Sequence, residues 1–381
     1  MTSRRRKSQS LTAAQPAECL EVRQMLTARI TAEIVGDQLN IIEEGAQIAD
    51  AEVDVMYVRG LNGVVVQGLN GTTINGRVSE FFELRGGDSI NVDLGSGNDT
   101  FTMHSWDGNR MPLSRLNIDM GSDVQGGNDN DVVSVEDIYA ATVNVLTAGV
   151  NEDVDEVTLN RVTASERLTI STGNMNDEVT IEECATGEIL IETDGGLSRN
   201  DSGNDDITIT KLEARGEVSI NTAGANAATD LDSIDIEDMS VLDSMFVKMG
   251  DGNNDIMAAD RLVVEEDLMF EGGQQQDVLV LRDAEIGRNL FANTYDGRDT
   301  VLVRDTRIGN WMVMETGDDV DFVELDRVFG FGINVRLGEG DDTMTIDNSG
   351  AFFGSIDGGA GRNTLNLGKM LWWRQGGFRN F

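Results

Sequence analysis

The chain has 381 residues, and 68 acidic side chains against 29 basic ones give it a formal net charge of −39. This charge excludes the usual nucleic-acid-binding protein, which needs a basic surface for phosphate contacts. Glycine is frequent at 43 residues and proline is rare at 2, which excludes collagen-like and proline-rich chains. Hydrophobic residues make up 39% of the chain, enough to build a packed core.

Cysteine and histidine are nearly absent from the chain. The two cysteines, Cys19 and Cys184, and the single histidine, His104, cannot supply a disulfide framework or a zinc site of several His and Cys. We interpret His104 as a surface or loop residue and Cys184 as a small core residue. No apolar run approaches the roughly 18 residues of a membrane-spanning helix, so no transmembrane segment is predicted.

Residues 1–28 form a basic leader with five basic and two acidic side chains. The stretch from Ser8 to Leu20 lacks the apolar region of a secretory signal. Residues 20–28 read LEVRQMLTA and resemble the Leu-Glu-x-Arg-x-Leu-Leu-x-Ala signature of exported planctomycete proteins, with Met25 where that signature usually has Leu. The resemblance implies an extracytoplasmic location, secreted or at the cell surface. A short amphipathic helix is the alternative interpretation.

Residues 29–90 alternate apolar and polar side chains without a regular spacing, for example in Ala32–Ile41 and Asp54–Val58. Alternation of this kind predicts short strands with one buried face. Terminal units of a repeat protein cover an exposed end of the core and are atypical in sequence. We therefore predict that residues 29–90 form an atypical N-terminal β cap.

Residues 91–368 contain a repeat in which an acid or amide, the anchor, precedes alternating apolar residues. Seven of the eleven steps between successive anchors are 21 to 23 residues long. Further apolar residues recur seven to nine and then 13 and 15 positions after each anchor, which predicts two or three short strands per unit. The anchors are Asp99, Asp131, Asp155, Asp177, Asp205, Asp232, Asn254, Gln276, Asp299, Asp321, Asp342 and Asn363.

This repeat predicts an all-β fold, a single-chain parallel β-helix or β-solenoid of about a dozen coils. Such a coil cannot bury its apolar face alone, and stacking the coils at ~4.8 Å buries a continuous column. A propeller is excluded because its blades need ~40 residues each, whereas a β-sandwich or tandem β domains stay open as alternatives. Longer steps at Met103 to Arg115 and at Leu197 to Asn204 predict protruding loops, where a binding face is expected.

Glycine-rich segments before the anchors resemble single units of the calcium-binding nonapeptide repeat, Gly-Gly-x-Gly-x-Asp-x-apolar-x. Residues 95–101 read GSGNDTF, residues 338–344 read GEGDDTM, and residues 358–365 are a degenerate third unit. The resemblance implies calcium held between stacked turns by carboxylate and carbonyl oxygens. Because these units never occur in tandem, the family's ligand geometry is not carried over. The candidate calcium ligands are Asp99, Asp255, Asp299, Asp341 and Asp342.

A separate electrostatic argument also favours calcium. Anchors stacked in register bring like-charged carboxylates of successive coils close together, and a hard cation would relieve the repulsion. Uncharged anchors at Asn254, Gln276 and Asn363 are an alternative relief. The remaining interpretation is that the anchors are corner residues that hydrogen-bond their own turn.

The last segment, residues 369–381, holds two of the four tryptophans, three basic residues and no acid. It is predicted to be an aromatic-basic cap over the last coil, with a sorting or docking tail as the alternative.

The function that the sequence favours is a non-enzymatic, extracytoplasmic structural or adhesive module with an acidic surface that binds calcium. Its expected partners are surface polysaccharide or other cell-surface proteins. The alternative function is a polysaccharide lyase or hydrolase of the parallel β-helix type, which needs clustered carboxylates, an Arg or Lys, and aromatic platforms for sugar rings. Trp106 is the one tryptophan near a predicted loop site.

Overall fold

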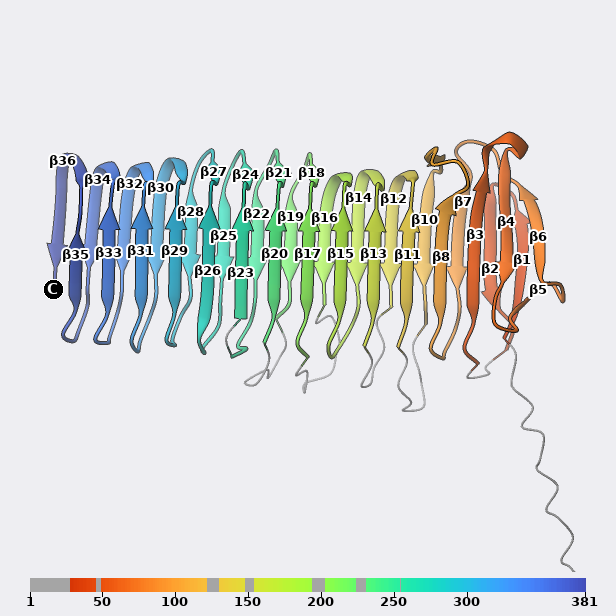
Figure 1. Ribbon diagram of the computed structural model, residues 1–381, viewed down its shortest axis with the longest axis horizontal. Helices are drawn as coiled ribbons and strands as arrows, with labels where there is room; N and C mark the ends of the chain where they lie inside the picture. The colour runs from red at the N-terminus through yellow and green to blue at the C-terminus, as the bar shows by residue number, and fades with distance from the viewer. Residues whose placement is uncertain are drawn as a thin grey trace, which may run out of the picture.

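The computed structural model describes residues 28–45, 49–121, 130–147, 154–193, 203–223, 231–253 and 255–381, without the side chains of 370–376. The fold is all-β, with 61% of residues in strands and about 11 stacked parallel turns. Figure 1 shows the turns in chain order along a straight rod. The predicted β-solenoid is therefore confirmed.

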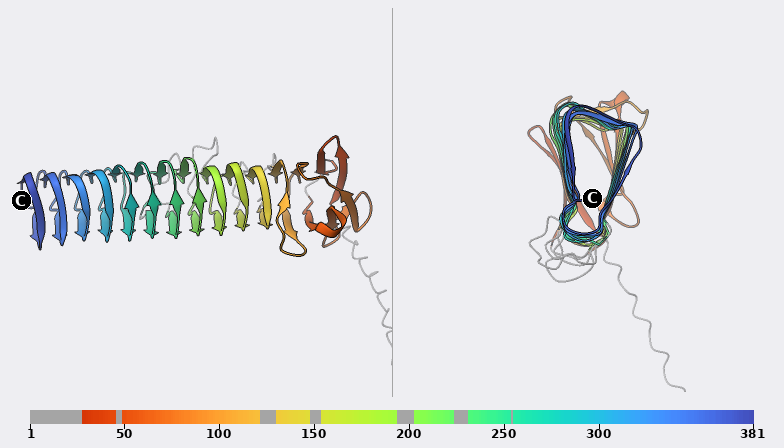
Figure 2. Two further views of the ribbon diagram at one scale, coloured as in Figure 1. Left: turned by 90° about the horizontal axis from the view of Figure 1, so that it is seen from above. Right: turned by 90° about the vertical axis from the view of Figure 1, so that its left-hand side faces the viewer.

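Each turn has three sides, so the rod is three-sided when seen along its axis (Figure 2). The first side, here called the anchor face, consists of the strands that follow the repeat's anchors. Parallel pairing joins these strands from each coil to the next within a 15-stranded sheet. They are β8 (Thr100–Ser105), β11 (Val132–Glu136), β13 (Glu156–Asn160), β15 (Glu178–Glu182), β17 (Asp206–Thr210), β20 (Ser233–Glu237), β23 (Asp255–Asp260), β26 (Asp277–Arg282), β29 (Thr300–Arg304), β31 (Phe322–Asp326), β33 (Thr343–Asp347) and β35 (Thr364–Leu367).

The other two sides, the narrow face and the return face, belong to one 21-stranded sheet. The narrow face has the short strands β9 (Met111–Pro112), β18 (Glu213–Ala214), β21 (Ser240–Val241), β24 (Val263–Val264) and β27 (Glu285–Ile286). The return face has β7 (Ser89–Asp93), β10 (Arg115–Asp119), β19 (Val218–Asn221), β22 (Met245–Lys248), β25 (Leu268–Glu271) and β28 (Leu290–Asn293).

Seven longer strands cover the narrow and the return face in one run. Where register shifts occur between neighbouring pairs, they fall between the two faces, as in the pairing of β12 with β14. These strands are β12 (Ile138–Leu146), β14 (Thr163–Ser171), β16 (Ala185–Glu192), β30 (Arg307–Glu315), β32 (Phe329–Arg336), β34 (Ser349–Asp357) and β36 (Met370–Arg379).

The two ends of the rod differ in their pairing. At the N-terminal end, β1 pairs with β2, β3 with β4 and β4 with β6 in antiparallel fashion, unlike the parallel coils that follow. At the other end, β36 pairs in parallel with β34 and completes a further coil. The N-terminal elements are β1 (Arg29–Val35), β2 (Gln38–Glu43), β3 (Glu52–Val58), the 3-10 turn η1 (Arg59–Leu61), β4 (Gly63–Gly68), β5 (Thr73–Ile74) and β6 (Ser79–Glu83).

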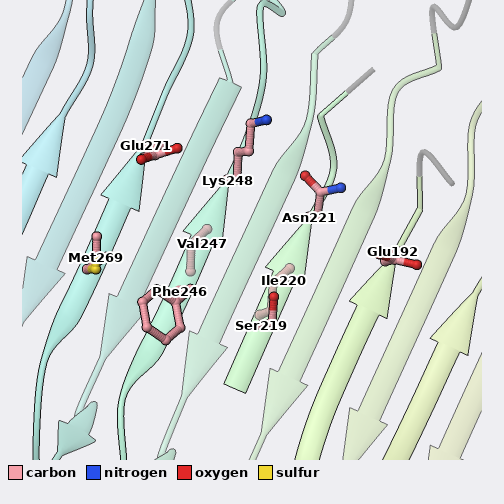
Figure 3. Close-up of a pocket in the computed structure, with 9 residues that line it drawn as sticks. All are labelled: Glu192, Ser219, Ile220, Asn221, Phe246, Val247, Lys248, Met269 and Glu271. Carbon is pink, nitrogen blue, oxygen red and sulfur yellow. The ribbon is translucent and has the colours of Figure 1, made fainter. Parts of the chain in front are cut away.

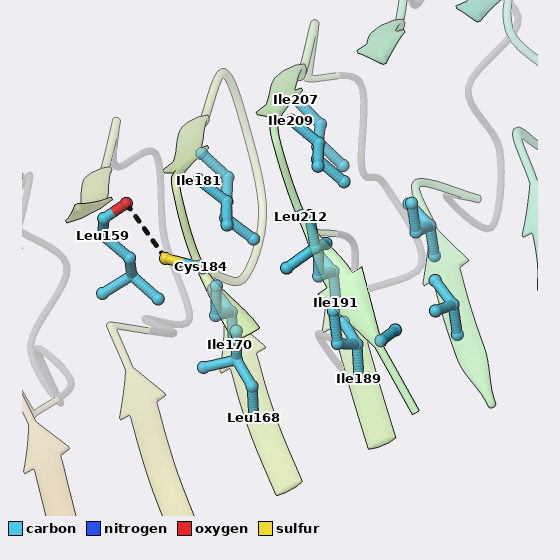
Figure 4. Packing of buried hydrophobic residues seen from close by; sticks show 14 of the residues in the cluster. Leu159, Leu168, Ile170, Ile181, Cys184, Ile189, Ile191, Ile207, Ile209 and Leu212 are labelled. Carbon is cyan, nitrogen blue, oxygen red and sulfur yellow. Dashed lines mark hydrogen bonds between the residues drawn. The ribbon is translucent and has the colours of Figure 1, made fainter. Parts of the chain in front are cut away.

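The core is one column of inward-facing aliphatic side chains from the three faces (Figure 4). Alternate residues of a strand point to opposite faces of the sheet, so a five-residue strand such as β15 buries two apolar side chains and a two-residue strand such as β18 buries one. Cys184 belongs to this column and is 4% exposed. Its thiol lies 3.2 Å from the carbonyl oxygen of Glu182 and 3.6 Å from that of Leu159, and burial raises the pKa of the thiol to about 11.

Two predicted anchors are wrong by one residue. The structure places Asp255 and Asp277 in the anchor position, where the sequence analysis had Asn254 and Gln276. The backbone N–H of Asp232 donates to Asp255, and Asp255 pairs with Asp277 across β23 and β26. The ladder of acids is therefore continuous here, and Asn363 is the only predicted uncharged anchor that occupies the position.

The first predicted insertion, Met103 to Arg115, contains the end of β8, a turn and β9. Trp106 lies in this turn and is 72% exposed. Most of the second predicted insertion, Leu197 to Asn204, lies outside the described residues.

Candidate functional sites

The predicted calcium ligands belong to the corner where the return face of one coil meets the anchor face of the next. A row of aspartates at this corner, here called the aspartate ladder, points into the core, and each member is at most 2% exposed. The ladder comprises Asp99, Asp131, Asp155, Asp177, Asp205, Asp232, Asp255, Asp277, Asp299, Asp321 and Asp342.

The ladder carboxylates satisfy backbone donors of the preceding coil. Asp131 Oδ1 accepts the N–H of Asp99 at 2.9 Å, and Asp321 Oδ1 accepts that of Asp299 at 2.9 Å. Asn363 continues the row, since its Oδ1 accepts the N–H of Asp342 at 2.9 Å and its Nδ2 donates to the carbonyl of Gly358 at 2.6 Å. An amide therefore performs the same capping as a carboxylate.

Burial in this row strongly favours the protonated carboxyl. Desolvation is the main cause that raises the pKa of Asp321 to about 8, and the carboxylates of Asp299 and Asp342 in the adjacent coils contribute to this increase. The same causes raise the pKa of Asp177 to about 10. A proton held by one of these carboxyls removes its repulsion with the carboxylates in the adjacent coils.

Of the five predicted calcium ligands, Asp99, Asp255, Asp299 and Asp342 belong to the ladder, one per coil and facing inward. Asp341 is exposed instead and accepts the backbone N–H of Arg362 at 2.8 Å. Within the residues that the structure describes, no group of three or more His, Cys, Asp or Glu side chains is arranged to hold a metal ion. Calcium binding stays a prediction.

A second, outward-facing row at the same corner caps the backbone in the opposite direction. Asn98 accepts the N–H of Asn130 in the next coil at 2.9 Å, and Asn204 accepts that of Leu231 at 2.8 Å. In five such pairs the outward residue and the buried Asp that follows it cap one N–H on each side of their coil. The pairs are Asn98-Asp99, Asn130-Asp131, Asn176-Asp177, Asn204-Asp205 and Asp341-Asp342. Capping thus gives the Asn-Asp and Asp-Asp pairs of the glycine-rich segments a role that needs no metal.

The corner between the anchor and narrow faces carries a row of mostly charged residues that were not predicted from the sequence. Ten non-glycine residues, each six positions after a ladder aspartate, have left-handed backbone with φ between 48° and 59°. Their signs mostly alternate, and ion pairs such as Lys211 with Glu183 at 2.8 Å join successive coils. This left-handed row is Asp137, Arg161, Glu183, Lys211, Asp238, Arg261, Asp283, Asp305, Arg327 and Asn348.

The return face displays two parallel rows of outward side chains along nine coils. One row is continuous by strand register and is here called the apolar row after its five apolar members, the other four being Ser, Asn, Ser and Gly. It consists of Leu190, Ser219, Phe246, Met269, Phe291, Val313, Asn334, Ser355 and Gly377. The polar row lies two residues further along each strand and consists of Glu192, Asn221, Lys248, Glu271, Asn293, Glu315, Arg336, Asp357 and Arg379.

A shallow hollow of about 350 Å³ opens on these rows in the middle of the rod. Figure 3 shows Phe246 and Met269 in the neighbouring strands β22 and β25. Lys248 and Glu271 lie two residues further along the same strands. The hollow combines apolar side chains with a few charged groups, which is the usual composition of ligand-binding surfaces.

A second hollow, of about 550 Å³, opens on the same rows nearer the C-terminal end. Trp311 and Phe353 line it together with Arg336, Asp357 and Arg379. Arg336 forms an ion pair with Glu315 at 2.8 Å. This hollow therefore brings two arginines and one acid beside aromatic rings, whereas the predicted polysaccharide-processing site needs clustered carboxylates.

The aromatic side of this hollow depends on a glycine. A Cβ at Gly332 would lie 2.2 Å from the Trp311 ring, so the indole occupies the space above the glycine backbone. From there it meets Phe331 edge-on at a centroid distance of 6.2 Å, and Phe331 meets Phe353 at 5.2 Å. The contacts fix the orientation of the rings.

His104 lies on β8, with its Nδ1 3.2 Å from Asp54 Oδ1, whereas Cys184 faces the core. The two side chains are not brought together. No helix among the described residues is long and apolar enough to cross a membrane.

The chain matches no known family of proteins, no curated protein and no solved structure.

Proposed function

We propose that this protein is a non-enzymatic, extracytoplasmic rod with a structural or adhesive role, which holds surface polysaccharide or other surface proteins along its length. The observation that carries the proposal is the alignment of two hollows on one face of a single continuous solenoid. A stack of coils that share one core is a stiff spacer, and its repeated outer face suits an elongated partner.

The composition of the outer faces supports adhesion. Exposed apolar side chains are frequent on this chain, for example Phe329 at 43%, Phe331 at 42% and Phe352 at 49%. Clustered exposed aromatic groups of this kind are typical of interaction surfaces. The extracytoplasmic location is part of the proposal and rests on the resemblance of residues 20–28 to the exported-protein signature, a segment mostly outside the described residues.

The experiment is a binding screen of the full chain against neutral and acidic polysaccharides and against surface proteins, with turnover measured in the same samples. Binding without product formation is the expected result. Failure to bind any of these partners would contradict the adhesive role.

The second candidate function, a polysaccharide lyase or hydrolase, is favoured by one observation. The hollow at Trp311 gathers Asp357 with Arg336 and Arg379. Glycoside hydrolysis ordinarily needs two carboxyl groups facing the scissile bond, and Asp357 is the only one that lines this hollow. Release of reducing or unsaturated sugars that disappears in Asp357→Asn would establish this function instead.

Calcium binding is the remaining part of the proposal. The exposed Asp341 and the ladder members Asp99, Asp255, Asp299 and Asp342 are its candidates. Calorimetric titration with calcium and thermal melting with a chelator test it. No heat of binding and an unchanged melting temperature would remove calcium from the proposal.

A further inference from the structure

We propose that the return face binds an uncharged linear polysaccharide lengthwise, with sugar rings packed on the apolar row and hydroxyl groups bonded to the polar row. This inference rests on the proposed adhesive function and names the ligand class and the site. It goes beyond that function in assigning one of the three faces and one polymer chemistry.

The first argument is the continuity of the site. Both hollows open on the same two rows, which the strand register carries through nine successive coils from Glu192 to Arg379. At about 4.8 Å per coil the rows extend over roughly 38 Å. A compact ligand would use one hollow, whereas an extended polymer contacts both and the residues between them.

The second argument is the pairing of the two rows. Sugar rings have apolar C–H faces and polar edges, so they suit an aromatic or aliphatic surface with hydrogen-bonding groups beside it. The apolar row offers Phe246, Met269 and Phe291, each half-buried. The polar row beside it offers the amides of Asn221 and Asn293 together with charged groups.

The third argument is charge. The polar row contains four carboxylates and three cations and is nearly neutral, although the chain as a whole has a net charge of −39. An acidic polymer would meet the repulsive field of the rest of the rod. The Arg336 guanidinium is already compensated by Glu315, so it favours neutral hydroxyl partners over an anionic group.

An extended peptide fits this face less well. Peptides that bind to sheets usually add a strand to an open edge. Along these rows β19, β22, β25 and β28 are each paired with a strand on both sides, so no edge is open to a further strand.

The test is affinity electrophoresis of the full chain in gels containing hydroxyethyl cellulose, an uncharged linear polymer, or polygalacturonate, an acidic one. We expect retardation by hydroxyethyl cellulose, and Phe246→Ala, Phe291→Ala and Trp311→Ala should each weaken it about threefold to tenfold. Phe322→Ala is the matched control, because Phe322 is a half-buried outward aromatic residue on the anchor face. It should change the affinity less than about twofold, and circular dichroism should show that all four variants are folded.

The outcomes separate the inference from the proposed function. Stronger retardation by polygalacturonate, or an equal loss in Phe322→Ala, would overturn the site or its chemistry while adhesion to polysaccharide stands. Retention of a surface protein with no retardation by either polymer would overturn the inference alone. Absence of every interaction would overturn both.

Discussion

At the scale of the residue, the buried carboxyl of Asp321 makes stability depend on pH. Burial raises the pKa of Asp321 from 3.8 to about 8, so the folded protein holds this proton more tightly than the unfolded chain. Its stabilising contribution is complete below pH ~4 and is lost as the pH rises through about 8. Asp321→Asn should remove this dependence and should be more stable than the parent at pH 9, by roughly 1–3 kcal/mol. Thermal melting between pH 5 and 9 checks this.

The chain already has an amide at one ladder position, and an exposed aspartate elsewhere provides a matched control. Asn363 already caps a backbone N–H from the ladder position and donates to a carbonyl five residues upstream. Asp305 is an exposed acid whose pKa is lowered by Arg327, so its contribution is lost as the pH falls and not as it rises. Asp305→Asn should therefore not stabilise the protein at pH 9. Equal pH profiles for Asp321→Asn and the parent would contradict the assignment.

The ladder also shows what was predictable from single residues. The recurring acid before alternating apolar residues was visible, and so was its stacking in register. Its inward direction was not, because a charged residue is expected to face water unless its partners are known. The left-handed row could have been found from the charges six positions after each anchor, but Arg161 and Lys211 are poor candidates for positive φ by residue type.

At the scale of the element, stacked corners require glycine where backbones of successive coils meet. Gly338 has a φ of +91°, and a Cβ there would lie 1.7 Å from the carbonyl oxygen of Gly317 in the preceding coil. Gly338→Ala should therefore destabilise the protein by about 4 kcal/mol or more, because the coil cannot approach its neighbour. Urea denaturation followed by circular dichroism measures the loss.

Gly36 separates the steric effect from the backbone effect. Its φ is +70°, and a Cβ there would meet nothing within 4 Å. Gly36→Ala should destabilise the protein by only about 1–2 kcal/mol, because left-handed backbone is unfavourable for an L-residue with a Cβ. Similar losses at the two positions would show that coil contact is not what demands glycine at Gly338.

Strands and corners were predictable because every coil buries apolar side chains in the same recurring pattern. The register error at Gln276 arose where Gln276 and Asp277 are adjacent polar residues and either one fits the anchor pattern. The return-face rows were not predicted, because their residues differ from coil to coil and only stacking brings Phe246, Met269 and Phe291 together. Packing in the core keeps the inward residues similar from coil to coil, whereas the outward residues differ.

At the scale of the whole molecule, the rod is a sum of coils that each contact only their neighbours. Stability then depends on intact interfaces between adjacent coils more than on the total number of coils. Such chains also depart from two-state unfolding as their number of repeats grows.

Deletion of residues 277–298 tests this directly, because it removes one whole coil of 22 residues and joins Gln276 to Asp299. The ladder is kept with Asp255 beside Asp299, and the left-handed row then places Arg261 next to Asp305 in place of two adjacent acids, Asp283 and Asp305. We expect a folded rod, shorter by about 4.8 Å, whose melting temperature changes by only a few degrees. Circular dichroism and small-angle X-ray scattering measure both properties.

Deletion of residues 277–287 removes β26 and β27 but leaves β28 without its coil, so this half-coil variant should melt far lower. Equal tolerance of the two deletions would mean that the coil is not the unit of stability.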